Sequence, residues 1–133
     1  MIVDASVIVS ALNPADVFHR QARGFLQAQE AAPQHLAAPT LLLAEVASGL
    51  RRALSDPQLA YQAWRMLEVE GLMGLVPVSS MMARRAAELS LELGLHGCDA
   101  VYVALAEQRG EPLISLDRRQ LERARGVIEA REP

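Results

Sequence analysis

The sequence predicts an α/β fold in which a short-stranded, mostly parallel sheet is covered by helices. Short apolar runs that suit buried strands alternate with longer segments whose apolar residues recur at helical spacing. Proline and glycine separate these segments. The chain has 133 residues, of which 51% are hydrophobic and 22% charged. This is the size and composition of one globular domain, which we expect to span residues 1–133.

The first predicted elements are a strand over residues 1–4 and a short helix over residues 5–12. Asn13 then precedes Pro14. An asparagine cap followed by proline at the first helical position is typical of a helix start. We therefore expect a second helix from this pair to about Ala31.

The next stretch holds a weak strand candidate and two helices. Residues 36–38 form the strand candidate, and Thr40 is expected to cap the helix that contains Glu45. The Asp-Pro pair at 56–57 has the pattern of a cap followed by a first helical residue. It predicts a helix that runs to about Gly71.

A third strand is predicted over residues 74–78, where a short apolar run follows glycine. Ser79 or Ser80 is expected to cap the helix that follows. That helix is expected to end at Gly94, because glycine adopts the left-handed conformation common at helix C-termini.

The last part of the chain continues the same alternation. An apolar helix is predicted over residues 99–110, a fourth strand over 112–116 and a short helix over 117–123. Residues 127–128, Val-Ile, are expected to add a final strand. Repeated strand–helix alternation is the pattern that gives a parallel sheet.

Four acidic residues lie within or beside apolar structure, where acids are uncommon: Asp4, Glu45, Asp99 and Asp117. Taken singly, each aspartate has a local explanation as a helix cap. Glu45 has no such explanation, because it lies in mid-helix beside small residues one turn away. A salt bridge from Arg52, seven residues further on, would have to reach back to it. Taken together, two acids that end strands, one that begins a buried helix and one inside an apolar helix favour a shared pocket over four separate local roles.

A shared pocket would concentrate negative charge. At about 5 Å and an effective dielectric constant near 20, each pair of ionised carboxylates costs roughly 3 kcal/mol. Such carboxylates either become protonated or bind a divalent cation. An all-oxygen set of ligands favours Mg²⁺ or Mn²⁺ over Zn²⁺. The three histidines show no ligand spacing, and Cys98 is expected to be a small core residue.

Composition excludes several other classes of protein. All thirteen basic residues are arginine, so chemistry that needs a lysine ammonium, including that of phosphorylated receivers, is excluded. Ser6 stands where an Asp-x-Asp phosphatase would need its second aspartate. The net charge of −3 argues against a globally basic nucleic-acid-binding protein. With one cysteine, no leader-like start and no apolar run of bilayer length, we expect a cytoplasmic protein without membrane contact.

Four motifs, in order, resemble those of the PIN-domain nucleases, and most of all the VapC-type toxins of bacterial toxin–antitoxin pairs. They are residues 2–6, residues 39–40 leading to Glu45, residues 98–106 and residues 113–119. The resemblance covers nearly the whole chain. It implies a PIN-like three-layer α/β/α fold over residues 1–133.

The same resemblance implies that the four acids, Asp4, Glu45, Asp99 and Asp117, are the catalytic residues and bind one or two Mg²⁺ or Mn²⁺ ions. Ser6 and Ser115 match supporting hydroxyl groups, although threonine is usual at the second position. Cys98 stands where a tyrosine is common in the family. This departure changes the wall of the pocket and none of the metal ligands.

The implied activity is that of a metal-dependent ribonuclease, a hydrolase that cuts RNA phosphodiesters to leave 5′-phosphate and 3′-hydroxyl ends. Single-stranded DNA is not excluded as a substrate. Arg118 and Arg119, and also Arg51 and Arg52, are candidates to bind substrate phosphates through their planar guanidinium groups. The alternative is that these arginines are solvated surface pairs.

The implied partners are a VapB-type antitoxin that inhibits the enzyme and a second copy of the chain in a homodimer. An apolar surface is expected to accept an amphipathic antitoxin helix, unless its residues are ordinary core: Phe25, Leu26, Leu59, Trp64 and Leu67. The alternative function is a non-catalytic PIN-fold interaction module that binds metal or a partner without cleavage.

Overall fold

A five-stranded parallel sheet forms the centre of the molecule in the computed structural model, which describes residues 1–30, 35–70 and 73–133. Within these ranges the strand order is β3-β2-β1-β4-β5, and every neighbouring pair is parallel. The strands are short: β1 Ile2–Val3, β2 Ala37–Pro39, β3 Gly74–Val76, β4 Leu113–Ile114 and β5 Ala130–Arg131.

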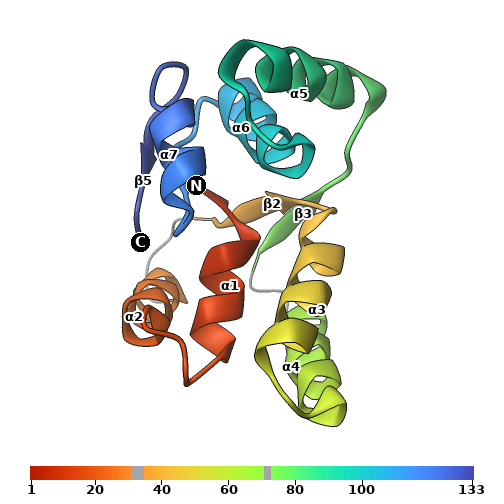
Figure 1. The fold of residues 1–133 in the computed structure, drawn as a ribbon, viewed down its shortest axis with the longest axis vertical. Helices are drawn as coiled ribbons and strands as arrows, with labels where there is room; N and C mark the ends of the chain where they lie inside the picture. The colour runs from red at the N-terminus through yellow and green to blue at the C-terminus, as the bar shows by residue number, and fades with distance from the viewer. Residues whose placement is uncertain (31–34, 71–72) are drawn as a thin grey trace.

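Helices cover both faces of this sheet, giving three layers (Figure 1). One layer holds α1, α2, α3 and α4, and the opposite layer holds α5, α6 and α7. This arrangement confirms the predicted α/β fold class. The seven helices of the described ranges are α1 Ala5–Leu12, α2 His19–Glu30, α3 Leu42–Ala53, α4 Pro57–Glu70, α5 Ser80–Leu93, α6 Gly97–Arg109 and α7 Arg118–Ala124.

The order of the strands explains why the helices fall into two layers. From β1 the chain moves outward to β2 and then β3, and from β3 it returns to β4 and continues to β5. Because parallel crossover connections are right-handed, reversing the direction of travel moves the connecting helices to the other face. The connections leave β1 and β4 towards opposite faces, so these neighbours form the topological switch point, where α/β proteins bind ligands.

The strands and the apolar part of α6 form the core. Ile2, Val3, Leu113 and Ile114 are fully buried, as expected of strands covered on both faces. Helix α6 packs on β1, β2 and β4. Within the described ranges no single helix is long and apolar enough to cross a membrane, and α5 and α6 reach that length and composition only as a pair bent by 112°.

Several helix ends follow the predicted local chemistry. Ser79 is the N-cap of α5, and its Oγ accepts a hydrogen bond from the backbone N–H of Met82. Asp56 accepts one from Gln58 at the start of α4. Gly94 ends α5 with a φ of 64°, a conformation that side-chain-bearing residues rarely adopt. These caps were predictable because each depends on residues only a few positions apart.

The start of α2 differs from the prediction. The helix begins at His19, although Asn13-Pro14 has the pattern of a helix start. Asn13 Oδ1 accepts from the N–H of Ala15, and Asp16 Oδ1 accepts from that of Phe18. Two successive turns of this kind offer the backbone an alternative to a helix, which delays helix formation until after Asp16. The predicted ends at Ala31 and Gly71 lie outside the described residues.

Two smaller predictions are also wrong. Thr40 does not cap α3, because Leu41 holds the N-cap position without a side-chain hydrogen bond. Residues 127–128 do not form the final strand, because the N–H groups of both bond to the carbonyl of Ala124. These bonds extend the end of α7 as a turn, so the sheet closes three residues later, at β5.

A close contact between α1 and α3 fixes the spacing of these helices. A Cβ atom added to Gly49 would lie 2.6 Å from Cγ2 of Val9. Valine is stiff at χ1 in a helix, so this methyl group cannot simply turn away. Glycine at position 49 therefore lets the two helices approach each other.

We expect Gly49→Ala to lower the free energy of unfolding by about 1 kcal/mol, because the overpacking cost of about 1–3 kcal/mol exceeds the roughly 1 kcal/mol that alanine gains over glycine in a helix. In a Val9→Ala background the same change should raise it, because the obstructing methyl groups are gone. Urea unfolding of the four proteins measures both differences. An equal effect of Gly49→Ala in the two backgrounds would contradict the contact.

Candidate functional site

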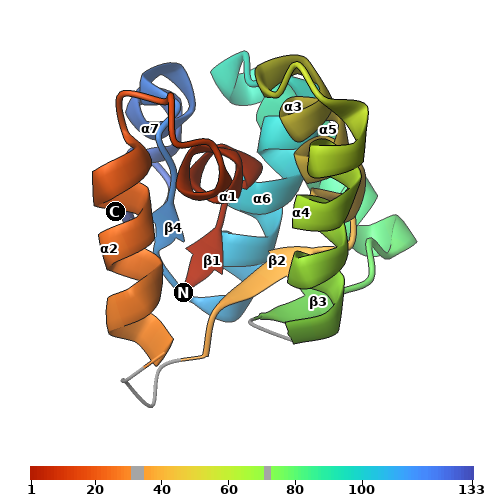
Figure 2. The ribbon, with the colours of Figure 1, turned by 90° about the horizontal axis from the view of Figure 1, so that it is seen from below.

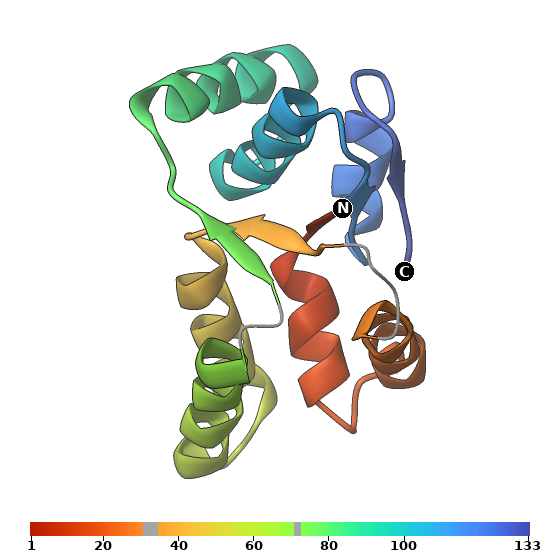
Figure 3. The ribbon, with the colours of Figure 1, turned by 180° about the vertical axis from the view of Figure 1, so that it is seen from behind.

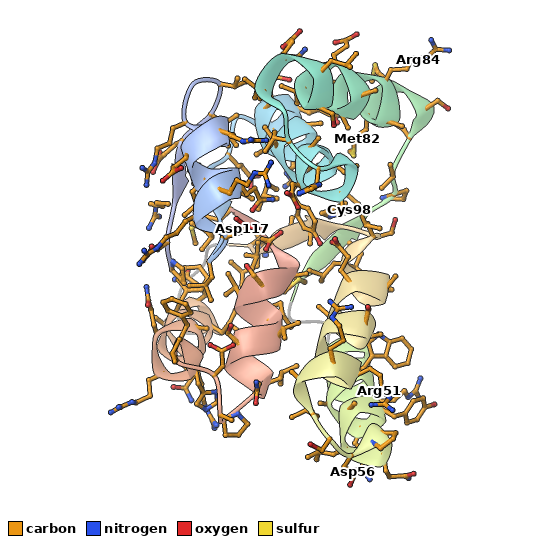
Figure 4. The ribbon with its side chains drawn as sticks, in the orientation of Figure 1. Arg51, Asp56, Met82, Arg84, Cys98 and Asp117 are labelled. Atoms are coloured by element: carbon orange, nitrogen blue, oxygen red, sulfur yellow. The ribbon has the colours of Figure 1, made fainter. Side chains whose placement is uncertain are left out.

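All four predicted acids line one pocket of about 570 Å³ at the carboxyl edge of the sheet. In Figure 4, Asp117 lies beside α7 and Cys98 beside α6, and both are near the beginning of α1. The acids come from four places: Asp4 follows β1, Glu45 lies on α3, Asp99 on α6 and Asp117 before α7. The other lining residues are Ala5, Ser6, Val9, Ala44, Ser48, Gly49 and Arg52.

Asp4 is the most buried acid of this pocket, with 7% of its surface exposed. It is the N-cap of α1, where its Oδ2 accepts from the N–H of Ser6 at 2.9 Å. Ser115 Oγ donates to the same oxygen at 3.3 Å, and Gln120 Nε2 lies 3.4 Å from Oδ1. Burial raises the pKa of Asp4, and these hydrogen bonds oppose the shift.

The two predicted supporting hydroxyls connect the loops that follow β1 and β4. Ser6 Oγ accepts from the N–H of Leu116 at 3.0 Å and lies 3.4 Å from Ser115 Oγ. Ser115 Oγ accepts from the N–H of Asp117 at 3.0 Å while donating to Asp4. These contacts hold the first and last acids of the pocket in a fixed relation, and the bond from Ser115 to Asp4 joins residues 111 positions apart in the sequence.

Glu45 accepts a hydrogen bond of 2.6 Å from the hydroxyl of Tyr102, which is fully buried in α6. Burial raises the pKa of Glu45, Tyr102 lowers it, and the charge of Asp4 raises it further. Tyr102 is thus part of the core, and its hydroxyl also orients an acid of the pocket.

Asp99 and Asp117 complete the group. Burial, followed by the charges of Asp4 and Asp117, raises the pKa of Asp99 from 3.8 to about 6. Asp99 does not cap α6, because the N-cap position is held by His96 and Asp99 lies in the first turn of the helix. Asp117 does cap α7, because its Oδ1 accepts from the N–H groups of Arg119 and Gln120. Asp117 therefore both caps α7 and lines the pocket.

The four acids have the ligand chemistry that a hard divalent cation requires. They supply only oxygen ligands, which Mg²⁺ and Mn²⁺ prefer, and their charges act on one another, as the raised pKa of Asp99 indicates. As placed, no three His, Cys, Asp or Glu side chains of residues 1–30, 35–70 and 73–133 are arranged to hold a metal ion. Carboxylate oxygens of three of the acids, Asp4, Glu45 and Asp117, are engaged instead by Ser6, Tyr102 and the first turn of α7. Metal binding by these residues stays a prediction, and it would require side chains to turn into the pocket.

The predicted arginines divide into two groups. Arg118 and Arg119 are exposed at the start of α7 and are not among the residues that line the pocket. Arg52 does line it, whereas Arg51 lines a separate hollow of about 190 Å³ between α3 and α4. Figure 4 shows Arg51 beside α4, away from Asp117.

Other residues near the pocket behave differently from expectation. Cys98 is exposed, so the expectation of a small core residue is wrong. Although the residue as a whole is exposed, partial desolvation of its thiol, followed by the charges of Glu45 and Asp99, raises the pKa of that thiol. Gln120 is 1% exposed and contacts Asp4, a role that no sequence pattern indicated.

The expected apolar surface is split between two flanks of the molecule. Phe25 and Leu26 lie on α2, and Leu59 and Trp64 on α4. Figure 2 shows α2 and α4 on opposite sides of α1, and Figure 3 shows the same from behind. The prediction of one groove is therefore wrong. The side chain of Leu67 lies outside the described residues.

Comparison with known proteins assigns the chain to a family. The PIN-domain family profile matches residues 1–126. Ribonuclease VapC3 of Pyrobaculum aerophilum is 30% identical over 131 residues, which cover 96% of this chain and 97% of that protein. The chain belongs to the PIN-domain family. Within it, the chain is similar to the VapC ribonucleases, as its motifs predicted.

Two solved structures share the fold. VapC20 of Mycobacterium tuberculosis, described as a toxin that cleaves the sarcin-ricin loop, has a TM-score of 0.77 at 20% identity, over 99% of this chain and 98% of that one. A toxin-antitoxin complex from Klebsiella pneumoniae has a TM-score of 0.64 at 23% identity, over 86% and 83%. They support the three-layer fold described above.

The burial of Asp99, together with the charges of the neighbouring acids, predicts a dependence of stability on pH. The pKa of Asp99, raised to about 6 from 3.8, means that the folded protein holds this proton more tightly than the unfolded chain. Stability is then lost as pH rises from about 3.8 to 6 and stays lower above that window. In EDTA, we expect Asp99→Asn to melt at a higher temperature than wild type at pH 7.5, with a smaller difference at pH 5.

Scanning calorimetry at the two pH values measures this difference, and Glu122→Gln, an exposed acid of α7, is the matched control. Added Mg²⁺ or Mn²⁺ should raise the melting temperature of wild type at pH 7.5 more than that of Asp99→Asn. A melting temperature of Asp99→Asn below that of wild type at pH 7.5 in EDTA would show that burial and the neighbouring charges do not disfavour the ionised Asp99 carboxylate.

Proposed function

We propose that this protein is a metal-dependent ribonuclease of the VapC type, which hydrolyses RNA phosphodiesters. The observation that carries the proposal is the meeting of Asp4, Glu45, Asp99 and Asp117 around one pocket at the switch point of the sheet. The ribonuclease relative, aligned over nearly its whole length, supports the choice of RNA as substrate.

In this proposal Asp4, Glu45, Asp99 and Asp117 hold Mg²⁺ or Mn²⁺. The cation, when bound, supplies activation of water and stabilisation of charge on the attacked phosphate. Hydrogen bonds from Ser6, Ser115 and Gln120 orient the Asp4 carboxylate for this role and oppose the rise of its pKa on burial.

Groups around the acids orient them. The Tyr102 hydroxyl holds Glu45, and the first turn of α7 holds Asp117. Such surrounding groups commonly affect metal affinity or activity 10- to 100-fold, although they do not touch the metal. The arrangement is thus supported by helices and strands rather than by mobile side chains alone.

Cleavage of a labelled RNA tests the proposal. We expect wild type to cleave in Mg²⁺ or Mn²⁺ and to lose activity in EDTA. Asp4→Asn should reduce the rate by more than about 100-fold, since it removes a metal ligand itself rather than a supporting group. Asparagine keeps an oxygen that can cap α1, so the variant should stay folded.

Glu122→Gln is the control for this experiment, because Glu122 is exposed and is not among the residues that line the pocket. Circular dichroism establishes that each variant is folded. Cleavage that survives both EDTA and Asp4→Asn would end the proposal. Metal binding without cleavage, measured by isothermal titration calorimetry, would support the alternative of a non-catalytic PIN-fold module.

We further propose that a VapB-type antitoxin inhibits this enzyme and that the chain forms a homodimer. The related fold in the Klebsiella pneumoniae toxin-antitoxin complex supports the antitoxin. On this chain, Leu59 and Tyr61 of α4 have 50% and 60% of their surface exposed, so α4 offers apolar area to an amphipathic helix.

A small polypeptide encoded beside this gene should copurify with the chain and stop RNA cleavage. Leu59→Glu should weaken that complex at least tenfold and leave cleavage by the free protein unchanged, because Leu59 is not among the residues that line the acidic pocket. Light scattering measures the mass of the free protein and of the complex. If the antitoxin inhibits Leu59→Glu as strongly as wild type, it binds a surface other than α4.

A further inference from the structure

One basic side chain, Arg52, lines the acidic pocket among the described residues. It is exposed, and within the same part of the chain none of the observed ion pairs includes it. Its Nη1 donates a hydrogen bond to Ser48 Oγ, one helical turn earlier. This bond directs the guanidinium group back along α3 towards the pocket.

The phase of α3 explains why Arg52 and not Arg51 faces the acids. Residues at spacings of three, four and seven share one face of a helix. Glu45, Ser48, Gly49 and Arg52 have these spacings, and all four line the pocket. Arg51 is one residue out of this series and lines the hollow against Tyr61 and Trp64.

The same geometry separates Arg52 from the acid on its own helix. At about 1.5 Å of rise per residue, the backbone of Arg52 lies about 10 Å along the helix axis from that of Glu45. Its guanidinium group reaches back to Ser48, and none of the ion pairs of the described residues joins it to Glu45, so it lies beside the carboxylates rather than between them. It is instead placed to contact a different part of a long substrate.

Charge favours such a contact if the pocket holds a single cation. Four ionised carboxylates carry more charge than one divalent cation neutralises, so the pocket would still repel a phosphodiester backbone. Arginine binds phosphate oxygens in pairs through its planar fork and stays charged at all relevant pH values. An unpaired arginine beside the acids supplies the attraction that they lack.

We propose that Arg52 is a substrate-binding residue that holds a backbone phosphate of single-stranded RNA next to the one being cut. This inference rests on the proposed ribonuclease function. It assigns the phosphate contact to α3, whereas the exposed pair Arg118 and Arg119 lies outside the pocket lining. Arg52 positions the strand and takes no part in bond cleavage.

Binding and cleavage measured separately test the inference. Binding of a 5′-labelled, unstructured RNA is followed by fluorescence anisotropy in EDTA at low salt, where no cleavage occurs. The proteins are wild type, Arg52→Ala, Arg52→Lys and the matched control Arg51→Ala, which removes the same charge from the adjacent position. Cleavage of the same RNA in Mg²⁺ gives KM and kcat.

We expect Arg52→Ala to weaken binding and raise KM by about tenfold or more relative to Arg51→Ala, with kcat within about twofold. The slope of log affinity against log salt should fall by about 0.7. Arg52→Lys should recover part of the loss, because it restores the charge without the fork.

Equal binding by Arg52→Ala and Arg51→Ala would overturn the inference, as would the absence of RNA binding by wild type. An effect of Arg52→Ala on kcat alone would also overturn it. If wild type binds RNA without cutting it, the ribonuclease proposal fails, and the binding comparison still decides the role of Arg52.

Discussion

The burial of the Asp4 carboxylate is the constraint on which the rest of this structure depends. A carboxylate at the end of a central strand is costly unless donors surround it. The donors come from the N–H of Ser6, the hydroxyl of Ser115 and the amide of Gln120. Two of these lie beyond residue 110, so satisfying one acid brings the two ends of the chain's sequence together at the switch point.

Stability and charge oppose each other around Asp4. The sheet and the helix ends bring four acids to one pocket, although like charges in such proximity weaken the folded state. Proteins tolerate strain of this kind at functional sites because the surrounding structure supplies the missing stability. Here the buried apolar strands and α6 provide it. A positively charged ligand in the pocket would offset the repulsion between these acids.

Local chemistry was predictable from the sequence, and long-range contacts were not. Ser79 and Asp56 were found as caps because their partners lie two or three residues away. The Tyr102 hydroxyl meets Glu45 across 57 residues, and Gln120 meets Asp4 across 116, which no spacing can reveal. The expected helix start at Asn13 was wrong because the side chains of Asn13 and Asp16 each accept a hydrogen bond from the backbone two residues further on. The different positions of Arg51 and Arg52 could have been predicted, because only Arg52 has a helical spacing, seven residues, that places it on the face of Glu45.

The exposed thiol at the rim has a practical consequence. Cys98 is the only cysteine of the chain and is close enough to Glu45 and Asp99 to be affected by their charges. A maleimide dye would thus attach at a single position, without background substitutions, one residue from an acid of the pocket. The emission of this dye would report the entry of a ligand into the acidic pocket in real time and without radiolabelled material.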